Sequence, residues 1–256
     1  MKLAYLFPGR TADRDDNPGF FRSLEATIQS VKRPDTSVEV ITLPNSLPEE
    51  GEMAYWYAHP KMFSAMIVAA KRAEKAGFDG VIVGCVGATD AEYGVKEVLD
   101  IPAVGVGEAA LLLAQVLGQN FAILTYDTKV AAWVDRMLRE RHLEDFCVSV
   151  RPANVTLAEM MARNGMPRIY QRILREAKAA IVEDRAEVIV IGSTGFAGLA
   201  DYLRKRIEAP VIDPVESGVK FAEMLVDLKR TKGLYQSKVA SFRASPNTEK
   251  VIAEFL

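Results

Sequence analysis

Two short segments of the chain repeat each other at a fixed distance. Val81-Ile-Val-Gly-Cys-Val-Gly87 matches Ile189-Val-Ile-Gly-Ser-Thr-Gly195 at an offset of 108 residues, which places Cys85 and Ser193 in equivalent positions. The match continues without a gap, with a proline 17 residues after each of these positions and a glutamate 23 residues after each: Pro102 and Pro210, Glu108 and Glu216. Several coincidences in one register indicate two similar structural units.

Short β-branched runs alternate with longer segments whose apolar residues recur at intervals of three and four. The second pattern is typical of an amphipathic helix and is clear in residues 61–76 and 168–183. The runs expected to form strands are 3–7, 38–42, 80–83, 103–106, 121–125, 148–150, 188–191 and 211–213. The alternation predicts an α/β fold in which helices flank mainly parallel sheets.

The repeat predicts two pseudo-symmetric lobes in the 256-residue chain. We expect residues 1–118 to form the first lobe, 119–225 the second, and 226–256 a C-terminal segment that packs back on the lobes. Ligands of open parallel sheets bind beyond the carboxyl ends of the strands. We therefore expect the turns at Cys85 and Ser193 to line an active site in a cleft between the lobes.

The composition is that of a globular protein and argues against several partners. Apolar residues make up 49% and charged residues 26% of the chain, and the net charge is −2 with dispersed Lys and Arg, which does not favour nucleic acid. No apolar run approaches the ~18 residues of a membrane span, and residues 1–7 are too short for a secretion signal. Two cysteines form neither a disulfide framework nor a zinc-like spacing. We expect a cytoplasmic homo-oligomer without a metal, acting on a small molecule.

Cys85 occupies a position in the predicted fold that suits a reactive thiol. It ends a strand and begins a glycine-containing turn, where backbone N–H groups and a helix dipole favour a thiolate or an anionic ligand. The alternative is a structural role, because cysteine is among the most buried residue types. For Ser193 the alternative is a helix cap.

The repeated segments resemble a known family. Residues 84–87, 101–110 and 121–125, with 192–195 and 209–213 in the second half, look like the hydantoin and allantoin racemase branch of the aspartate/glutamate/hydantoin racemase superfamily. The resemblance covers most of the chain. It implies two pseudo-symmetric α/β lobes, no cofactor, and two cysteines on opposite sides of the substrate that act as base and acid.

The resemblance also implies roles for residues of the two turns. One group removes a proton from the carbon next to a carbonyl, and the other returns a proton to the opposite face of the enolate. Cys85 and position 193 would be these groups. The N–H groups at two helix starts would hold the enolate oxygen, and they belong to Val86, Gly87, Thr194 and Gly195.

Ser193 departs from the two-cysteine pattern of the family. A hydroxyl is a far poorer base than a thiolate unless a neighbour activates it. The serine is either an engineered replacement of a cysteine or the mark of a natural one-cysteine relative. Arylmalonate decarboxylases of this superfamily use one cysteine, although in the second half of the chain. A cofactor-free decarboxylase, isomerase or lyase is therefore the alternative function.

Further substrate-binding candidates follow the first strands of the two repeats. Pro8, Arg10 and Thr11 correspond to a proline-containing substrate loop of relatives, and the Arg10 guanidinium suits a carboxylate, unless it is an exposed loop residue. Thr125 and Tyr126 end the first strand of the second lobe. Tyr126 resembles the tyrosine in the oxyanion site of the decarboxylases, or is a loop tyrosine with an exposed hydroxyl.

Several other polar and aromatic residues have two interpretations. Tyr55 and Tyr57 either cover the cleft or serve as packing residues. Glu108 and Glu216 begin helices, where a carboxylate is favoured by the helix dipole, so we prefer a structural role over a catalytic one.

Two competing functions come from other classes. Gly105-Val-Gly-Glu-Ala-Ala110 fits the dinucleotide-binding pattern, with Asp127 about twenty residues on, and would suggest an NAD-dependent oxidoreductase. Glu108 argues against it, because a carboxylate would face the pyrophosphate. A non-catalytic small-molecule binder with two lobes is the other possibility.

Overall fold

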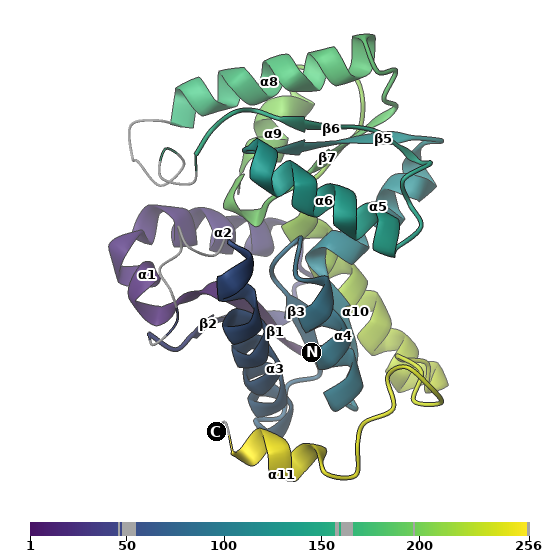
Figure 1. Cartoon of the computed structure of the whole chain (residues 1–256). Coiled ribbons are helices and arrows are strands. Elements are labelled where there is room, and N and C mark those ends of the chain that lie inside the picture. Colours follow the sequence, from purple (N-terminus) through teal and green to yellow (C-terminus); the bar gives the residue numbers. More distant parts are fainter. Residues whose placement is uncertain (46, 48–54, 157–158, 160–165, 197, 255–256) are drawn as a thin grey trace. The chain divides into compact units, whose positions relative to one another are not determined.

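The first sheet of the protein contains four parallel strands in the order β2-β1-β3-β4 (Figure 1). The computed structural model describes residues 1–45, 47, 55–156, 159, 166–196 and 198–254. The strands of this sheet are β1 (Lys2–Arg10), β2 (Ser37–Leu43), β3 (Gly80–Val83) and β4 (Ala103–Gly105). Parallel neighbours require a crossover connection between consecutive strands, and helices supply it here.

The second sheet has the same topology, with the order β6-β5-β7-β8. Its strands are β5 (Phe121–Thr125), β6 (Cys147–Pro152), β7 (Val188–Ile191) and β8 (Val211–Ile212). Each of the eight strands in the described part of the chain overlaps a run predicted from the sequence, although β1, β2 and β6 are longer than predicted. The α/β fold built from parallel sheets is confirmed.

The helices lie on the two sheets and bury apolar faces against them. In α3, the residues Met62, Met66, Ala70 and Ala73 are buried because they recur at intervals of three and four on one face. The helices in chain order are α1 (Thr11–Asp16), α2 (Pro18–Val31), η2 (Trp56–Ala58), α3 (His59–Lys75), α4 (Thr89–Val98), α5 (Val106–Leu117), α6 (Thr128–Glu140), α8 (Met166–Val182), η3 (Thr194–Phe196), α9 (Leu199–Arg204), α10 (Pro214–Lys232) and α11 (Thr248–Ala253). Within the described ranges, no helix has the length and apolarity to cross a membrane.

The two sheets carry the sequence repeat in the same register. Val81 pairs with Ala103 in the first sheet, and Ile189 pairs with Val211 in the second, so the 108-residue offset holds for both partners. Backbone bonds beyond the strands repeat as well. The N–H of Gly84 donates to Leu6 O at 2.9 Å, and the N–H of Gly192 donates to Leu124 O at 2.7 Å.

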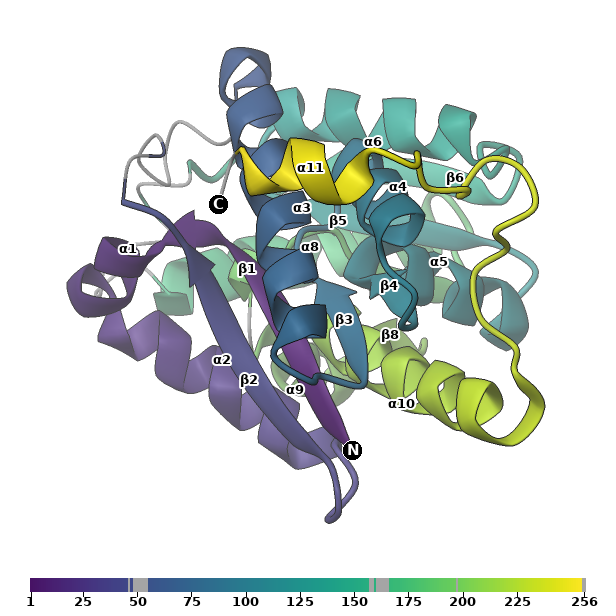
Figure 2. The ribbon, with the colours of Figure 1, turned by 90° about the horizontal axis from the view of Figure 1, so that it is seen from below.

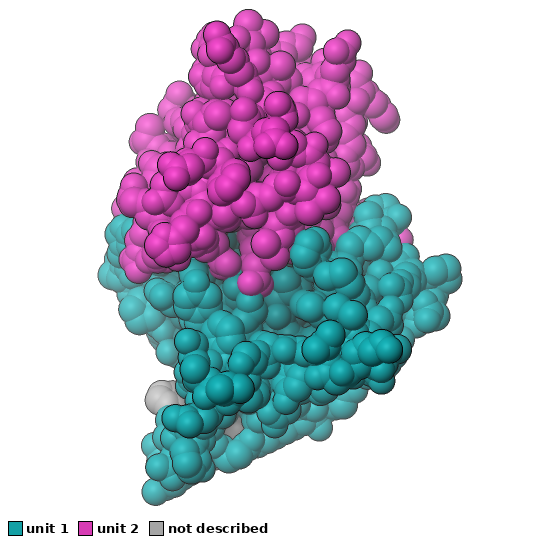
Figure 3. All heavy atoms as spheres, turned by 90° about the vertical axis from the view of Figure 1, so that its right-hand side faces the viewer, with its two compact units in different colours: residues 1–16, 30–106, 218–256 teal, residues 17–29, 107–217 magenta. Residues whose placement is uncertain are grey.

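The compact units of the protein differ from the lobes expected from the repeat. Unit 1 contains residues 1–16, 30–106 and 218–256, and unit 2 contains residues 17–29 and 107–217 (Figure 3). The expected boundaries at 118 and 225 do not coincide with these limits, because α5 and α10 each begin in one unit and continue in the other. The limits differ because the sequence repeat identifies equivalent residues, whereas a compact unit is defined by which residues contact each other in space.

The end of the chain belongs to unit 1. The Gln236 side chain donates to Leu99 O at 3.1 Å and to Ile101 O at 2.8 Å, beyond the last turn of α4. In α11, the Glu249 carboxylate contacts Lys71 and Lys75 of α3 at 3.0 and 2.6 Å. Figure 2 shows α11 lying across α3.

Candidate active site

The turn that carries Cys85 leaves β3 close to the neighbouring strand. A Cβ at Gly84 would overlap the Tyr5 ring and lie 2.6 Å from Leu6 O, so only glycine allows this approach. Cys85 follows directly and is partly exposed. The N–H groups of Gly87 and Ala88 donate to its sulfur. The turn therefore presents a thiol that its own backbone supports.

Burial raises the pKa of the Cys85 thiol from 9.0 to about 11, and the two N–H donors oppose this effect only in part. The sequence predicted that a helix start would favour the thiolate. In the structure α4 begins only at Thr89, four residues after Cys85, and desolvation outweighs the N–H donors. At neutral pH the group is a protonated thiol, which is a proton donor.

The turn that carries Ser193 has the same construction in the second sheet. A Cβ at Gly192 would lie 2.7 Å from Ile123 Cγ2 and 2.9 Å from Leu124 O. The N–H of Gly195 donates to Ser193 Oγ at 3.1 Å, as the N–H of Gly87 does to the Cys85 sulfur. These N–H groups, predicted to hold an enolate, bond to the two side chains in this structure.

The residues that follow Cys85 and Ser193 were both predicted to lie at helix starts, and the structure differs at one of them. Val86 and Gly87 lie in the turn before α4, and not in a helix. Thr194 and Gly195 lie in the 3-10 helix η3. The prediction of two helix starts is therefore wrong for the first turn.

The expectation that residues 8–10 follow the first strand as a loop is also wrong, whereas their role in substrate binding stays a prediction. β1 extends to Arg10, and α1 begins at Thr11. The register with β2 shifts between Leu6 and Arg10, and Pro8, which has no N–H to donate, is buried in this irregularity.

Arg10 is held within unit 1. Its guanidinium contacts the buried Asp13 at 3.0 Å through Nε and at 2.8 Å through Nη2, and its backbone N–H donates to the same carboxylate. Arg10 is therefore a fixed and partly compensated cation, and not a free loop residue. Thr11 Oγ1 lies 3.0 Å from Thr42 Oγ1.

Thr125 and Tyr126 lie at the carboxyl end of β5, beside the strand that leads to Ser193. Thr125 is fully buried, and its Oγ1 has no hydrogen-bond partner among the described residues. Tyr126 is 8% exposed and packs edge-on against Phe196, with ring centroids 6.1 Å apart. The Tyr126 ring belongs to the core of unit 2, and its role in an oxyanion site stays a prediction.

Each unit therefore gathers its own set of candidate residues. Parallel strands end at the same edge of their sheet, so the ends of β1 and β3 bring the first set together and the ends of β5 and β7 the second. The set of unit 1 is Pro8, Arg10, Thr11, Cys85, Val86 and Gly87. The set of unit 2 is Thr125, Tyr126, Ser193, Thr194 and Gly195.

The structure adds polar residues that the sequence interpretation missed. Thr89, the first residue of α4, is buried, and its Oγ1 has no hydrogen-bond partner in the described part of the chain. Asp213 is 2% exposed and accepts from the N–H of Val215 at 2.8 Å. Burial, and after it the charge of Glu216, raises the pKa of Asp213 to about 7. Position alone, just beyond a strand end, was the available signal for Asp213.

The two glutamates of the repeat bind arginines. The carboxylate of Glu216 accepts two bonds from Arg204, at 2.9 and 2.6 Å, and Glu108 lies 3.8 Å from Arg141. Both glutamates stand in the first turn of their helices, as predicted.

The dinucleotide-binding alternative does not fit the geometry around Gly105. α5 begins at Val106, directly after β4, and leaves no loop to hold a pyrophosphate. The Glu92 carboxylate occupies the space where a Cβ of Gly105 would stand. Lys96 pairs with Glu92 at 3.0 Å.

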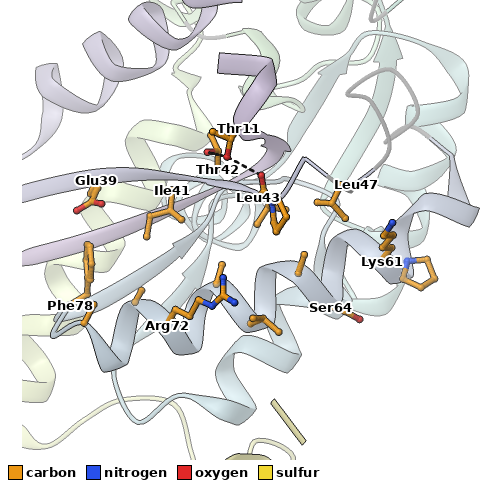
Figure 4. A pocket seen from close by; sticks show the side chains of 17 residues that line it. Thr11, Glu39, Ile41, Thr42, Leu43, Leu47, Lys61, Ser64, Arg72 and Phe78 are labelled. Atoms are coloured by element: carbon orange, nitrogen blue, oxygen red, sulfur yellow. Dashed lines mark hydrogen bonds between the residues drawn. The ribbon is translucent and has the colours of Figure 1, made fainter. Parts of the chain in front are cut away.

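A separate hollow of about 860 Å³ lies between β2 and α3 (Figure 4). Its walls are mainly apolar side chains of both elements, and Arg72 reaches into it from α3. Of the candidate residues, only Thr11 lines it. Cys85 does not line this hollow.

Comparison with known proteins decides the family. The model of the Asp/Glu/hydantoin racemase family matches residues 17–222. The chain belongs to this family. Hydantoin racemase from Pseudomonas sp. (strain NS671) is 29% identical over 253 residues, which cover 98% of this chain and 94% of that protein.

Solved structures of similar proteins share the fold. Allantoin racemase from Pseudomonas fluorescens is 27% identical, with a TM-score of 0.80 over 96% of this chain and 97% of its own. A mutant of arylmalonate decarboxylase, in which one glycine is cysteine and one cysteine is serine, is 17% identical, with a TM-score of 0.64 over 88% and 92%. The resemblance inferred from the repeated motifs is confirmed, and the protein is an enzyme of the racemase family.

Proposed function

We propose that the protein is a cofactor-independent racemase that acts on a carbon next to a carbonyl in a hydantoin-like ring. Cys85 and Ser193 occupy the two proton-transfer positions, and Cys85 is the competent one. The membership in the racemase family and the similarity to hydantoin and allantoin racemases support this substrate class.

The observation that carries the proposal is the equivalent backbone support of two different side chains. Cys85 and Ser193 follow equivalent glycines, and each accepts the N–H of the residue two positions later, Gly87 and Gly195. A racemase requires one group on each face of a planar enolate, and a repeat of this kind provides two matched positions.

The chemistry of each position follows from its acidity. In one direction of the reaction, position 193 takes up the α-proton and so forms the enolate. The Cys85 thiol, with a pKa of about 11, then donates its proton to the opposite face of the enolate carbon, and the charged sulfur keeps the N–H groups of Gly87 and Ala88. A serine hydroxyl is a weak base, and Ser193 accepts from Gly195 without a carboxylate or imidazole bonded to its Oγ within the described residues. We therefore expect racemisation by the native chain to be slow.

The test is polarimetry with single-enantiomer 5-methylhydantoin. We expect optical rotation to decay with the Ser193→Cys variant at least a hundredfold faster than with the native chain, since positioned acid–base groups contribute about 10²–10⁴-fold. Ser193→Ala is the matched control and should behave like the native chain. Equal rates for all three proteins would reject the proposal.

A decarboxylase is the second candidate, because a single protonated thiol suits a reaction that needs one proton donor. The neutral Cys85 thiol and the unactivated Ser193 favour it, as does the fold shared with arylmalonate decarboxylase. Release of carbon dioxide from phenylmalonate by the native chain, lost in Cys85→Ala, would establish this function instead.

A further inference from the structure

Three consecutive aromatic side chains are exposed at the start of α3. Tyr55, Trp56 and Tyr57 are 45%, 47% and 68% exposed, and the rings of Tyr55 and Tyr57 lie 6.3 Å apart. Packing in the interior of unit 1 does not explain such exposure. Adjacent exposed aromatic rings are typical of surfaces that bind a ligand or partner.

Chain topology places these rings at the edge of the first sheet that carries Cys85. α3 ends at Lys75 and leads into β3, which runs to Val83 and the Cys85 turn. A helix that precedes a strand in this way returns along it in the opposite direction, so the first residues of α3 lie at the carboxyl end of β3. The aromatic residues directly precede that end of the helix.

A chain of ring contacts connects Trp56 with Phe63, at the apolar cluster of unit 1. The Trp56 ring stands edge-on to His59, with centroids 5.2 Å apart, and His59 lies 5.0 Å from Phe63. Phe63 and Cys85 pack against the same apolar cluster of unit 1. Trp56 thus extends an aromatic wall outward from the cluster that contacts Cys85.

We propose that Trp56 and Tyr57 form the subsite for the substituent on the reacting carbon, and that this subsite takes an aromatic or large apolar group. This inference rests on the proposed function. Aromatic faces provide apolar area and ring contacts worth about two- to tenfold in affinity for each ring. A ureido substituent, as in allantoin, would lose its hydration against these faces, and a methyl group would cover little of them.

The experiment measures binding and does not depend on turnover. Isothermal titration of the full native chain compares 5-benzylhydantoin, 5-methylhydantoin and allantoin as probes. We expect the benzyl compound to bind at least tenfold more tightly than the other two. Trp56→Ala and Tyr57→Ala should each reduce this preference to about threefold or less, whereas Trp56→Phe should retain most of it.

Tyr235→Ala is the matched control, because Tyr235 is also an exposed aromatic residue of unit 1 but lies in the C-terminal segment. It should leave the preference unchanged. The inference would be overturned if Trp56→Ala and Tyr57→Ala kept the native preference for 5-benzylhydantoin. Tighter binding of allantoin than of 5-benzylhydantoin, or no binding of any probe, would also overturn it.

A turnover measurement separates this inference from the proposed function. In the Ser193→Cys background, Trp56→Ala should raise KM for 5-benzylhydantoin about five- to tenfold with little change in kcat, and leave 5-methylhydantoin unaffected. Loss of kcat on both substrates would contradict a subsite role. Benzyl-selective binding without racemisation of 5-methylhydantoin in that background would reject only the proposed function.

Discussion

The turn at Cys85 and the turn at Ser193 are the same backbone device with different chemistry. Each leaves a central parallel strand through a glycine that approaches the neighbouring strand, and each supports its polar side chain with an N–H two residues later. One side chain is a thiol and the other a hydroxyl. The comparison shows that the fold repeats the backbone support of the side chain, while the chemistry of each position depends on a single residue.

The carboxylates behind the two turns differ in a similar way. Asp213, just past β8, caps α10 in unit 2, whereas its equivalent in the repeat is Gly105, beside which the Glu92 carboxylate of α4 is paired with Lys96. Each sheet has a buried carboxylate near the same place. The two copies supply it from different elements and compensate its charge differently.

Among the changes that distinguish the two turns, removal of the Cys85 thiol is expected to have the largest effect on activity. Cys85→Ala should reduce α-proton exchange on 5-methylhydantoin by about 10²–10⁴-fold, because the minor thiolate form of Cys85 removes the α-proton and the thiol then returns a hydrogen exchanged with solvent. Ser193→Ala should change exchange by less than about threefold. Proton NMR in deuterium oxide follows the loss of the α-proton signal in both variants.

An equal loss of α-proton exchange in Cys85→Ala and Ser193→Ala would contradict this difference between the two turns. That result would mean that the Ser193 hydroxyl carries as much of the proton transfer as the thiol. Circular dichroism of each variant checks that the fold is retained.

The second effect concerns the buried carboxylate of unit 2. The unfolded chain releases the Asp213 proton near pH 3.8 and the native protein near pH 7, so the stability that the protonated group confers is complete below pH 3.8 and lost as the pH rises to about 7. The loss amounts to at most about 4 kcal/mol, at ~1.4 kcal/mol per pKa unit. Asp213→Asn, which still caps the helix, avoids it.

Thermal unfolding of native and Asp213→Asn protein at pH 4 and pH 8 measures this effect. The variant should melt at a higher temperature at pH 8, and the two proteins should converge at pH 4. A variant that is less stable at pH 8 would show that the charged carboxylate is favourable in the native state.

The smallest effect distinguishes the two glycines. Gly84→Ala should destabilise unit 1 by about 2–3 kcal/mol, because the added methyl group meets the Tyr5 ring and a carbonyl oxygen. Gly192→Ala should cost about 1–2 kcal/mol, since its contacts at 2.7 and 2.9 Å are less severe. Urea unfolding curves compare the two, and a larger cost for Gly192→Ala would contradict the geometry.

The sequence predicted the strands well because short β-branched runs mark them, and the repeat identified equivalent segments of the two halves. The match of residues 81–87 with 189–195 identified both central strands and both turns, and the structure confirms them. The extent of β1 was predicted less well. Pro8 favours the end of a strand, but pairing of Arg10 with Leu43 extends β1 beyond it.

Acidity and exposure depend on contacts that no sequence pattern contains. Cys85 stands at the predicted position, yet its pKa follows from how much of the thiol is desolvated. No sequence pattern indicated the contact between the Tyr126 ring and Phe196, because the two residues are 70 positions apart in the chain. Asp13, which holds Arg10, gave no signal because the pair depends on how α1 follows β1.

The most direct test of the central claim is the configuration and deuterium content of the first product formed by Ser193→Cys. A single enantiomer of 5-methylhydantoin is incubated in deuterium oxide and analysed at low conversion by chiral chromatography with mass spectrometry. Two proton-transfer groups on opposite faces predict that the early product is the opposite enantiomer with one deuterium, while recovered substrate stays largely unlabelled. Early deuterium in the starting enantiomer, without inversion, would show that one group works alone and would contradict the equivalence of the two turns.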